Sequence, residues 1–394
     1  MAIYHVTAKI VSRKKGQSVV ACACYRAAEE LYDERLGQKW DYTRKRGVAH
    51  CEILAPPQAL GWMRDRGALW NAVERAELRK DAQLAREIEI GLPVELTQER
   101  QIELLRDFVK RTFVEKGMVA DAALHRDNPE NPHAHVLLTL RQLTPEGFGW
   151  KRRDWNAKEN LLQWRAQWAQ VANEHLARAG LDIRIDHRTL EAQGIDLVPG
   201  RKLGLSVERQ RQPGLPRNLA ERVAEQRAIA AENGRRIIND PRIALRALTH
   251  MQGTFALRDV GKFLHGRTDG VVQFDAAYLK VTTSPELVVL GDDEGGGARF
   301  TTRGMLEVGG RRLERGRRLG GVSEQVGLAD IDAVQQRAAE RWLAKQQARE
   351  LGLSGERQVE VSHGAELDKG AGSGLGEEKN RHQGYRGPED ELDI

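Results

Sequence analysis

The chain has little cysteine and no long hydrophobic run. Its 394 residues include three cysteines, Cys22, Cys24 and Cys51, too few for a disulfide framework. We interpret them as reduced packing residues of a cytosolic protein. No stretch approaches the roughly 18 apolar residues of a membrane span, and the first residues lack the basic start and apolar core of a signal peptide. These absences predict a cytoplasmic protein that does not contact a membrane.

The chain also lacks the phosphate-binding signature of nucleotide-driven motors. No G-x-x-x-x-G-K-[S/T] motif occurs in it, so we expect no ATP hydrolysis. Acidic residues nearly balance basic ones, and the formal net charge is only +5. The basic residues nevertheless gather in runs at 151–153, 235–236 and 311–318. A single run is usually a solvated surface, but several together favour a polyanionic partner.

The most informative stretch places one histidine before a short polar loop and two after it. His133 and His135 are two residues apart, so in a strand they lie on the same face. The intervening Asn-Pro pairs at 128–129 and 131–132 are turn signals. Folding the chain back about this loop brings His125 opposite His133, at about 4.5–5.5 Å. The spacing therefore predicts three imidazoles on one face of a hairpin.

Three convergent imidazoles form a candidate site for a divalent metal with open ligand positions. The competing interpretation is coincidence, because a lone histidine is usually a surface residue or a satisfied one. The chain holds only 11 histidines, and three in this geometry beside two turn signals favour the metal. The identity of the ion stays open, since Zn²⁺ suits imidazole whereas Mg²⁺ or Mn²⁺ suits a site that handles phosphate.

Hydrophobic periodicity predicts strands interleaved with helices over residues 1–205. The predicted strands are 3–10, 48–54, 85–92, 118–125 and 133–140, and the predicted helices are 17–31, 70–78, 97–113 and 161–179. Because the histidine hairpin is antiparallel, these elements favour an α+β fold with a mostly antiparallel sheet.

A change in composition after residue 205 indicates a second region. We expect a helical linker at 206–240, a small domain at 241–320, a helix at 321–351 and a disordered tail at 352–394. The small domain has helical patterns at 243–251, 257–264 and 274–279, followed by a hairpin of 287–290 and 298–302. Three helices and a hairpin are the parts of a winged helix-turn-helix, although a generic helical cap has the same parts.

A metal that polarises a phosphate needs an attacking group, and Tyr25 is the candidate. It lies with Arg26 on a helix of small residues directly after the first strand, where a bulky polymer backbone could approach. A phenol is a weak nucleophile at neutral pH and needs a metal or a basic group to ionise. The alternative is a packed tyrosine with a hydrogen-bonded hydroxyl, which is the commoner fate.

Two carboxylates form a second candidate group. Glu87 and Glu89 alternate with Ile88 and Ile90, so both glutamates lie on one strand face. One of them could orient a ligand histidine or accept the tyrosine proton. Two solvated carboxylates at a sheet edge explain the pattern equally well.

Six blocks in one order resemble the MobA/MobL family of plasmid relaxases, a branch of the tyrosine HUH endonucleases. The blocks are Ala2–His5 with Thr7–Lys9, Tyr25–Arg26, Trp70–Glu74, Arg86–Glu89 with Leu92–Pro93, Asn131–His135, and Arg184–Arg188 with Gln193–Gly194. The resemblance covers residues 1–205 and implies the HUH relaxase fold, a five-stranded antiparallel sheet flanked by helices. It further implies a divalent cation on His125, His133 and His135, and Tyr25 as the nucleophile. The role of the block around Asp186 is not assigned.

The family's reaction is a transesterification at a plasmid origin of transfer. The resemblance implies that Tyr25 attacks a phosphodiester of single-stranded DNA, forming a 5′-phosphotyrosyl link and a free 3′-hydroxyl, and that the step can reverse. The implied partners are that DNA, accessory mobilisation proteins, a coupling protein and a type IV secretion system, in a bacterial cytoplasm. Trp62, Trp155 and Tyr42 are candidates for stacking on unpaired bases, although each is better explained as a core residue.

The region 244–318 resembles the segment that follows the relaxase in TraA-like relaxase–helicase fusions, through Thr254–Asp259 and Arg299–Arg303. The missing phosphate-binding loop separates this chain from the fusions. DNA contact is the expected role of the region, and a remnant of truncation is the alternative. Three other functions stay open: a replication initiator or transposase with the same chemistry, a DNA-binding regulator with structural histidines, and a hydrolytic metallonuclease.

Overall fold

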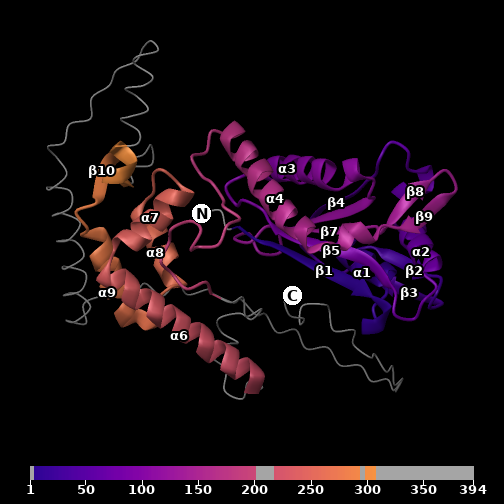
Figure 1. Cartoon of the computed structure of the whole chain (residues 1–394), viewed down its shortest axis with the longest axis horizontal. Helices are drawn as coiled ribbons and strands as arrows, with labels where there is room; N and C mark the ends of the chain where they lie inside the picture. The colour runs from indigo at the N-terminus through magenta and orange to yellow at the C-terminus, as the bar shows by residue number, and fades with distance from the viewer. Residues whose placement is uncertain (1–3, 201–216, 293–297, 308–394) are drawn as a thin grey trace, which may run out of the picture.

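The computed structural model describes residues 4–200, 217–292 and 298–307, which form two units with separate hydrophobic cores (Figure 1). The helix expected at 321–351 and the tail at 352–394 lie outside the described residues. Among those that are described, no helix is long and apolar enough to cross a membrane.

The first unit is built on a five-stranded sheet. Its strands are β1 (Val6–Ser12), β4 (Val48–Leu54), β5 (Gln83–Gly91), β6 (Ala120–His125) and β7 (His133–Leu138). They run in the order β1-β5-β7-β6-β4, and each neighbouring pair is antiparallel. The predicted α+β class and five-stranded antiparallel sheet are confirmed.

Helices cover both faces of this sheet (Figure 1). The helices are α1 (Val19–Ala27), α2 (Arg66–Ala76), α3 (Gln98–Thr112) and α4 (Lys158–Arg178). Even-numbered strand residues such as Ile88 and Val136 join the core under α3 and α4. Odd-numbered residues face the other way, and Leu137 and Val119 pack with α1 and α2. This alternation with period two decides which polar side chains meet α1.

The structure contains two small hairpins that the sequence patterns did not predict. They are β2 (Glu30–Asp33) with β3 (Gln38–Asp41), and β8 (Arg141–Thr144) with β9 (Gly147–Lys151). The first corrects the helix expected over 17–31, because α1 ends at Ala27. Ala28 adopts a left-handed conformation with φ 55° and its N–H caps the carbonyl of Cys24. Leu31 then lies in β2 rather than in the helix.

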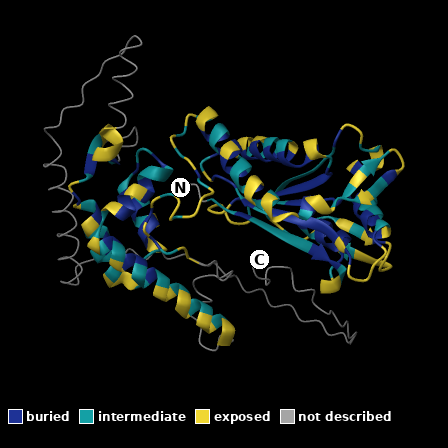
Figure 2. Cartoon of the chain, viewed as in Figure 1, coloured by how far each residue is buried: buried dark blue, intermediate teal, exposed yellow. Residues whose placement is uncertain are grey.

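The second unit contains the helices and the hairpin expected after residue 205. Its elements are α6 (Arg217–Asn239), α7 (Arg242–Met251), α8 (Leu257–His265), α9 (Gly270–Thr282), β10 (Leu287–Asp292) and β11 (Ala298–Thr302). Its core also takes in Ile195, Leu197 and Ile237, which precede α7 in the chain. Buried residues that precede 201 and buried residues that follow 216 therefore belong to one core. Figure 2 shows buried positions in both units.

Candidate active site

The three histidines converge as their spacing predicts. His125 pairs with His133 across the antiparallel strands β6 and β7. The ring centroids lie 5.3 Å apart for His125 and His133, 4.9 Å for His125 and His135, and 5.2 Å for the remaining pair. One ligand atom from each residue can be chosen so that all three lie within 4.8 Å of one another. This donor set suits a divalent metal.

Each imidazole uses one ring nitrogen to contact an acceptor. Nε2 of His125 lies 2.8 Å from the carbonyl oxygen of Arg26, and Nδ1 of His133 lies 3.0 Å from the carbonyl oxygen of Asn131. Nδ1 of His135 lies 2.7 Å from Oε1 of Glu87. Carbonyl and carboxylate oxygens accept, so these ring nitrogens carry the proton. The opposite nitrogen of each ring is then a lone-pair donor, which is the arrangement expected around a bound metal.

Burial keeps the deepest of these imidazoles neutral. Desolvation lowers the pKa of His125 to about 3, against the opposing hydrogen bond with the Arg26 carbonyl, and the ammonium of Lys45 adds to the lowering. Burial also lowers the pKa of His135, against the opposing charge of Glu87. A metal competes with protons for the ring nitrogen, so a neutral imidazole at physiological pH is ready to bind.

The two glutamates have different partners. Glu87 is buried, accepts from His135, and forms a two-pronged ion pair with Arg26, whose Nε lies 2.6 Å from Oε1 of Glu87. Burial alone would raise the pKa of Glu87, but the charges of Arg26 and His135 hold it well below its usual range. Glu87 is therefore an ionised carboxylate that orients a histidine of the cluster.

Glu89 instead belongs to the β1 side of the site. Nε2 of His5 lies 3.4 Å and Nζ of Lys9 lies 3.2 Å from its carboxylate oxygens. The hydrogen bond with His5 is the main cause that lowers the pKa of Glu89. His135 lies directly opposite Glu89 on the neighbouring strand, so this carboxylate borders the cluster.

The helix end that carries Tyr25 adjoins the histidine cluster. Arg26, the next residue, accepts a hydrogen bond from His125 through its carbonyl and pairs with Glu87 through its guanidinium. The Tyr25 side chain is partly exposed. Lys45 places its ammonium 3.7 Å from the Tyr25 ring centroid, and Tyr42 contacts the same ring edge-on at 5.2 Å. The nucleophile candidate and the imidazoles thus share one face and one end of the sheet.

Some participants in this site had no role in the sequence analysis. Arg26 is next to Tyr25 in the sequence, but its ion pair with Glu87 joins residues that are 61 positions apart in the chain. Lys45 lies in a loop without a periodic pattern, and His5 was visible only as part of a family block. Of the candidate stacking aromatics, Trp155 is buried, Tyr42 is partly exposed and Trp62 is exposed. Trp150 on β9 is 86% exposed and is not among the predicted stacking residues.

The backbone at Gly47 lies close to Asp127 beside the histidine cluster, and this contact leads to a stability prediction. Gly47 has φ +89°, and a Cβ built there would lie 2.5 Å from Cβ of Asp127, just after β6. We expect Gly47→Ala to lower the free energy of unfolding by about 1–3 kcal/mol from backbone strain, with an added loss from the displaced Asp127. Urea unfolding measures this change. Gly37→Ala is the matched control, because φ is +64° there but nothing lies within 4 Å.

Similarity to known proteins decides the family. The MobA/MobL family model matches residues 17–212. A mobilization protein MobL from Acidithiobacillus ferridurans is 36% identical over 271 residues, covering 58% of this chain and 71% of that protein. The chain belongs to the MobA/MobL family. The resemblance carried by the six blocks is therefore confirmed.

Two further matches extend the comparison of this MobA/MobL protein. A conjugal transfer protein TraA from Agrobacterium fabrum is 38% identical over 349 residues, covering 78% of this chain and 32% of TraA. That match extends past the region of the family model, and the chain spans only about a third of the TraA length. A solved structure titled "Molecular Basis of Vancomycin Resistance Transfer in Staphylococcus aureus" is 38% identical, with a TM-score of 0.46, and covers 48% of this chain and 100% of that one.

Proposed function

We propose that this protein nicks and rejoins one strand of DNA at a plasmid origin of transfer by tyrosine transesterification. One observation carries the proposal: the three imidazoles meet the end of α1 that bears Tyr25. Membership of a family whose named relatives are mobilisation proteins supports it. The same reaction would place the protein in the bacterial cytoplasm, with accessory mobilisation proteins, a coupling protein and a type IV secretion system as partners.

In this proposal the Tyr25 hydroxyl oxygen attacks the phosphorus of one phosphodiester. A bond forms between that oxygen and phosphorus as the phenol proton is released to solvent. The bond from phosphorus to the 3′ oxygen breaks, and that oxygen takes up a proton from solvent to become the free 3′-hydroxyl. The ammonium of Lys45 stabilises negative charge as the phenol loses its proton. Because one phosphodiester replaces another, the step is close to energy-neutral, and the same residues can rejoin the strand.

The residues around the cluster prepare it for a cation. His125, His133 and His135 would hold the ion, with Mg²⁺ or Mn²⁺ preferred over Zn²⁺, and the bound ion would neutralise charge on the phosphate oxygens. Glu87 fixes the ring of His135, and Arg26 in turn neutralises Glu87. Glu89, paired with His5 and Lys9, contributes negative charge at the border of the site.

A covalent adduct tests the proposal. The protein is incubated with Mn²⁺ or Mg²⁺ and labelled single-stranded oligonucleotides that tile both strands of the DNA flanking its gene. Denaturing electrophoresis should reveal one oligonucleotide whose 3′-side fragment, linked through its 5′-phosphate, migrates with the protein, together with a 5′-side fragment that ends in a free 3′-hydroxyl. Cleavage that leaves a free 5′-phosphate and no adduct would show a hydrolytic nuclease. Tight duplex binding without cleavage, unaffected by a chelator, would show a regulator.

A further inference from the structure

The second unit has the order of elements of a winged helix-turn-helix. After α7 come a strand-like bridge at Phe255, the helices α8 and α9, and the hairpin of β10 and β11. Phe255 pairs with Phe300 of β11 through two backbone hydrogen bonds, of 2.9 and 2.8 Å. β11 is therefore the central strand of a small antiparallel sheet, with β10 on its other side. This pairing ties the hairpin to the helices, which a generic helical cap does not require.

α8 and α9 form the helix-turn-helix pair of this unit. Residues 266–269 join them, a connection of the length typical of this motif, and the turn begins with a glycine. Phe263 of α8 and Ala277 of α9 are buried in one core. α6 also contacts α9, where the amide of Gln273 donates to the carbonyl of Ala231 at 2.8 Å. In this motif the first helix crosses the DNA backbone, and the second enters the major groove with its N-terminal residues.

The first helix of the pair carries two exposed cations. Arg258 and Lys262 lie four positions apart on α8, so their side chains share one face of the helix. Both are exposed, and among the residues that the structure describes neither forms an ion pair. One solvated cation on a helix is common. Two on the helix that crosses the backbone in this motif match the charge of DNA phosphates.

The second helix begins with two exposed valines. Val271 and Val272 lie in the first turn of α9 and are 70% and 86% exposed. The acidic residue just before them, Asp269, is paired with Arg227 of α6 at 3.1 Å, which offsets its charge. In the major groove, the apolar group that a protein can contact is the C5-methyl group of thymine. The first turn of α9 therefore suits thymine methyl groups.

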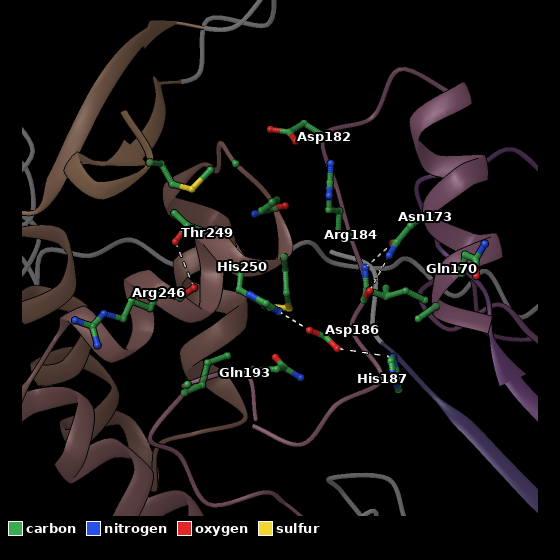
Figure 3. A pocket seen from close by; sticks show the side chains of 18 of the residues that line it. Gln170, Asn173, Asp182, Arg184, Asp186, His187, Gln193, Arg246, Thr249 and His250 are labelled. Atoms are coloured by element: carbon green, nitrogen blue, oxygen red, sulfur yellow. Dashed lines mark hydrogen bonds and ion pairs between the residues drawn. The ribbon is translucent and has the colours of Figure 1, made fainter. Parts of the chain in front are cut away.

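The contact between the two units is made by the end of α7. The backbone N–H of Arg184 donates to the carbonyl of Met251 at 2.6 Å. Nε2 of His250 lies 2.8 Å from a carboxylate oxygen of Asp186 (Figure 3). The cavity at this contact is lined mainly by α4, the segment 182–195 and the end of α7. The contact thus fixes the second unit on the first while the cations of α8 and the valines of α9 stay exposed.

We propose that the second unit binds double-stranded DNA, with Arg258 and Lys262 at backbone phosphates and Val271 and Val272 at thymine methyl groups in the major groove. The order of elements and the two exposed pairs of side chains carry the proposal. It goes beyond the proposed nicking reaction, which takes place on an unpaired strand at the histidine cluster of the first unit. One molecule would then hold paired and unpaired DNA on separate units.

Equilibrium binding by the full chain tests the cations, with EDTA present so that no strand is cut. The probe is a blunt, fluorescein-labelled duplex of A·T pairs, about 20 base pairs or roughly two helical turns long, measured by anisotropy at several salt concentrations. Arg258→Ala with Lys262→Ala should weaken binding about tenfold and lower the salt slope by about 2, one for each lost phosphate contact. Lys110→Ala with Lys116→Ala is the matched control, because these exposed cations lie on and just after α3 in the first unit. It should change both quantities much less.

A second duplex, with deoxyuridine in place of every thymidine, tests the valines. It lacks only the methyl groups, and each one that the protein buries should contribute about fourfold in affinity. The unaltered protein should therefore prefer the thymidine duplex, whereas Val271→Ser with Val272→Ser should bind both duplexes equally. Because all four side chains are exposed, neither double variant should shift the midpoint of urea unfolding.

Two results would overturn the proposal. If Arg258→Ala with Lys262→Ala binds the duplex as the unaltered protein does, or if the first-unit control weakens binding equally, the second unit does not hold the duplex. If the unaltered protein binds both duplexes equally, α9 does not contact thymine methyl groups. Since no strand is cut in these measurements, their outcome is independent of the adduct assay.

Discussion

Tyr25→Phe is expected to abolish the covalent protein–DNA adduct. The substitution removes only the hydroxyl oxygen that would bond to phosphorus, and phenylalanine keeps the ring that Lys45 and Tyr42 contact. Loss of a nucleophile lowers the rate of such a step by at least about a thousandfold. Single-turnover reactions with the cleaved oligonucleotide, resolved by denaturing electrophoresis, measure the rate. Binding of the uncut strand should stay within about twofold, since one partly exposed hydroxyl contributes little.

Two other tyrosines make this experiment decisive. Tyr42 packs edge-on against Tyr25, so it is the alternative nucleophile beside the histidine cluster. Tyr278 lies on α9 in the second unit and stacks on Phe274, which makes it a distant control. We expect Tyr42→Phe and Tyr278→Phe to form the adduct. An adduct that persists in Tyr25→Phe and disappears in Tyr42→Phe would transfer the nucleophilic role to the neighbour.

Local patterns predicted the parts of this site well. The spacing of His125, His133 and His135 specified a hairpin register, and the strands pair in that register. Alternation around Glu87 and Glu89 likewise placed both carboxylates on the face that α1 covers. These features follow from the period of a strand and from turn signals, which depend on neighbouring residues alone.

Interactions between distant segments could not be predicted in the same way. Arg26 meets Glu87 because α1 crosses the sheet at a particular angle, and nothing in either segment encodes that crossing. The end of α1 was also missed, since an alanine at a left-handed position, Ala28, is an uncommon helix terminator. The contact between the two units has no sequence signal either, because Arg184 and Met251 form their backbone hydrogen bond only when the two cores dock.

The second large effect is expected from the loss of one imidazole or of the ion. Removal of a residue that hydrogen-bonds a metal ligand usually lowers metal affinity 10- to 100-fold, or about 1–3 kcal/mol. His135→Ala should lower the Mn²⁺ affinity by more than this. It removes a donor atom outright and leaves Glu87 with only Arg26 as a partner among the described residues. Calorimetric titration of the chelator-stripped protein with Mn²⁺ measures the affinity. Adduct formation should fall in parallel and should also stop when EDTA is added to the unaltered protein.

His265→Ala separates this effect from a general loss of histidine. His265 is exposed at the end of α8, away from the imidazole cluster, so its removal should leave both the affinity and the adduct unchanged. The two measurements also separate two roles of the cluster. If His135→Ala binds Mn²⁺ normally but forms no adduct, His135 contacts the DNA and is not a ligand. If it loses Mn²⁺ and still forms the adduct at the normal rate, the phenol acts without a cation, and the proposed role of the imidazoles is wrong.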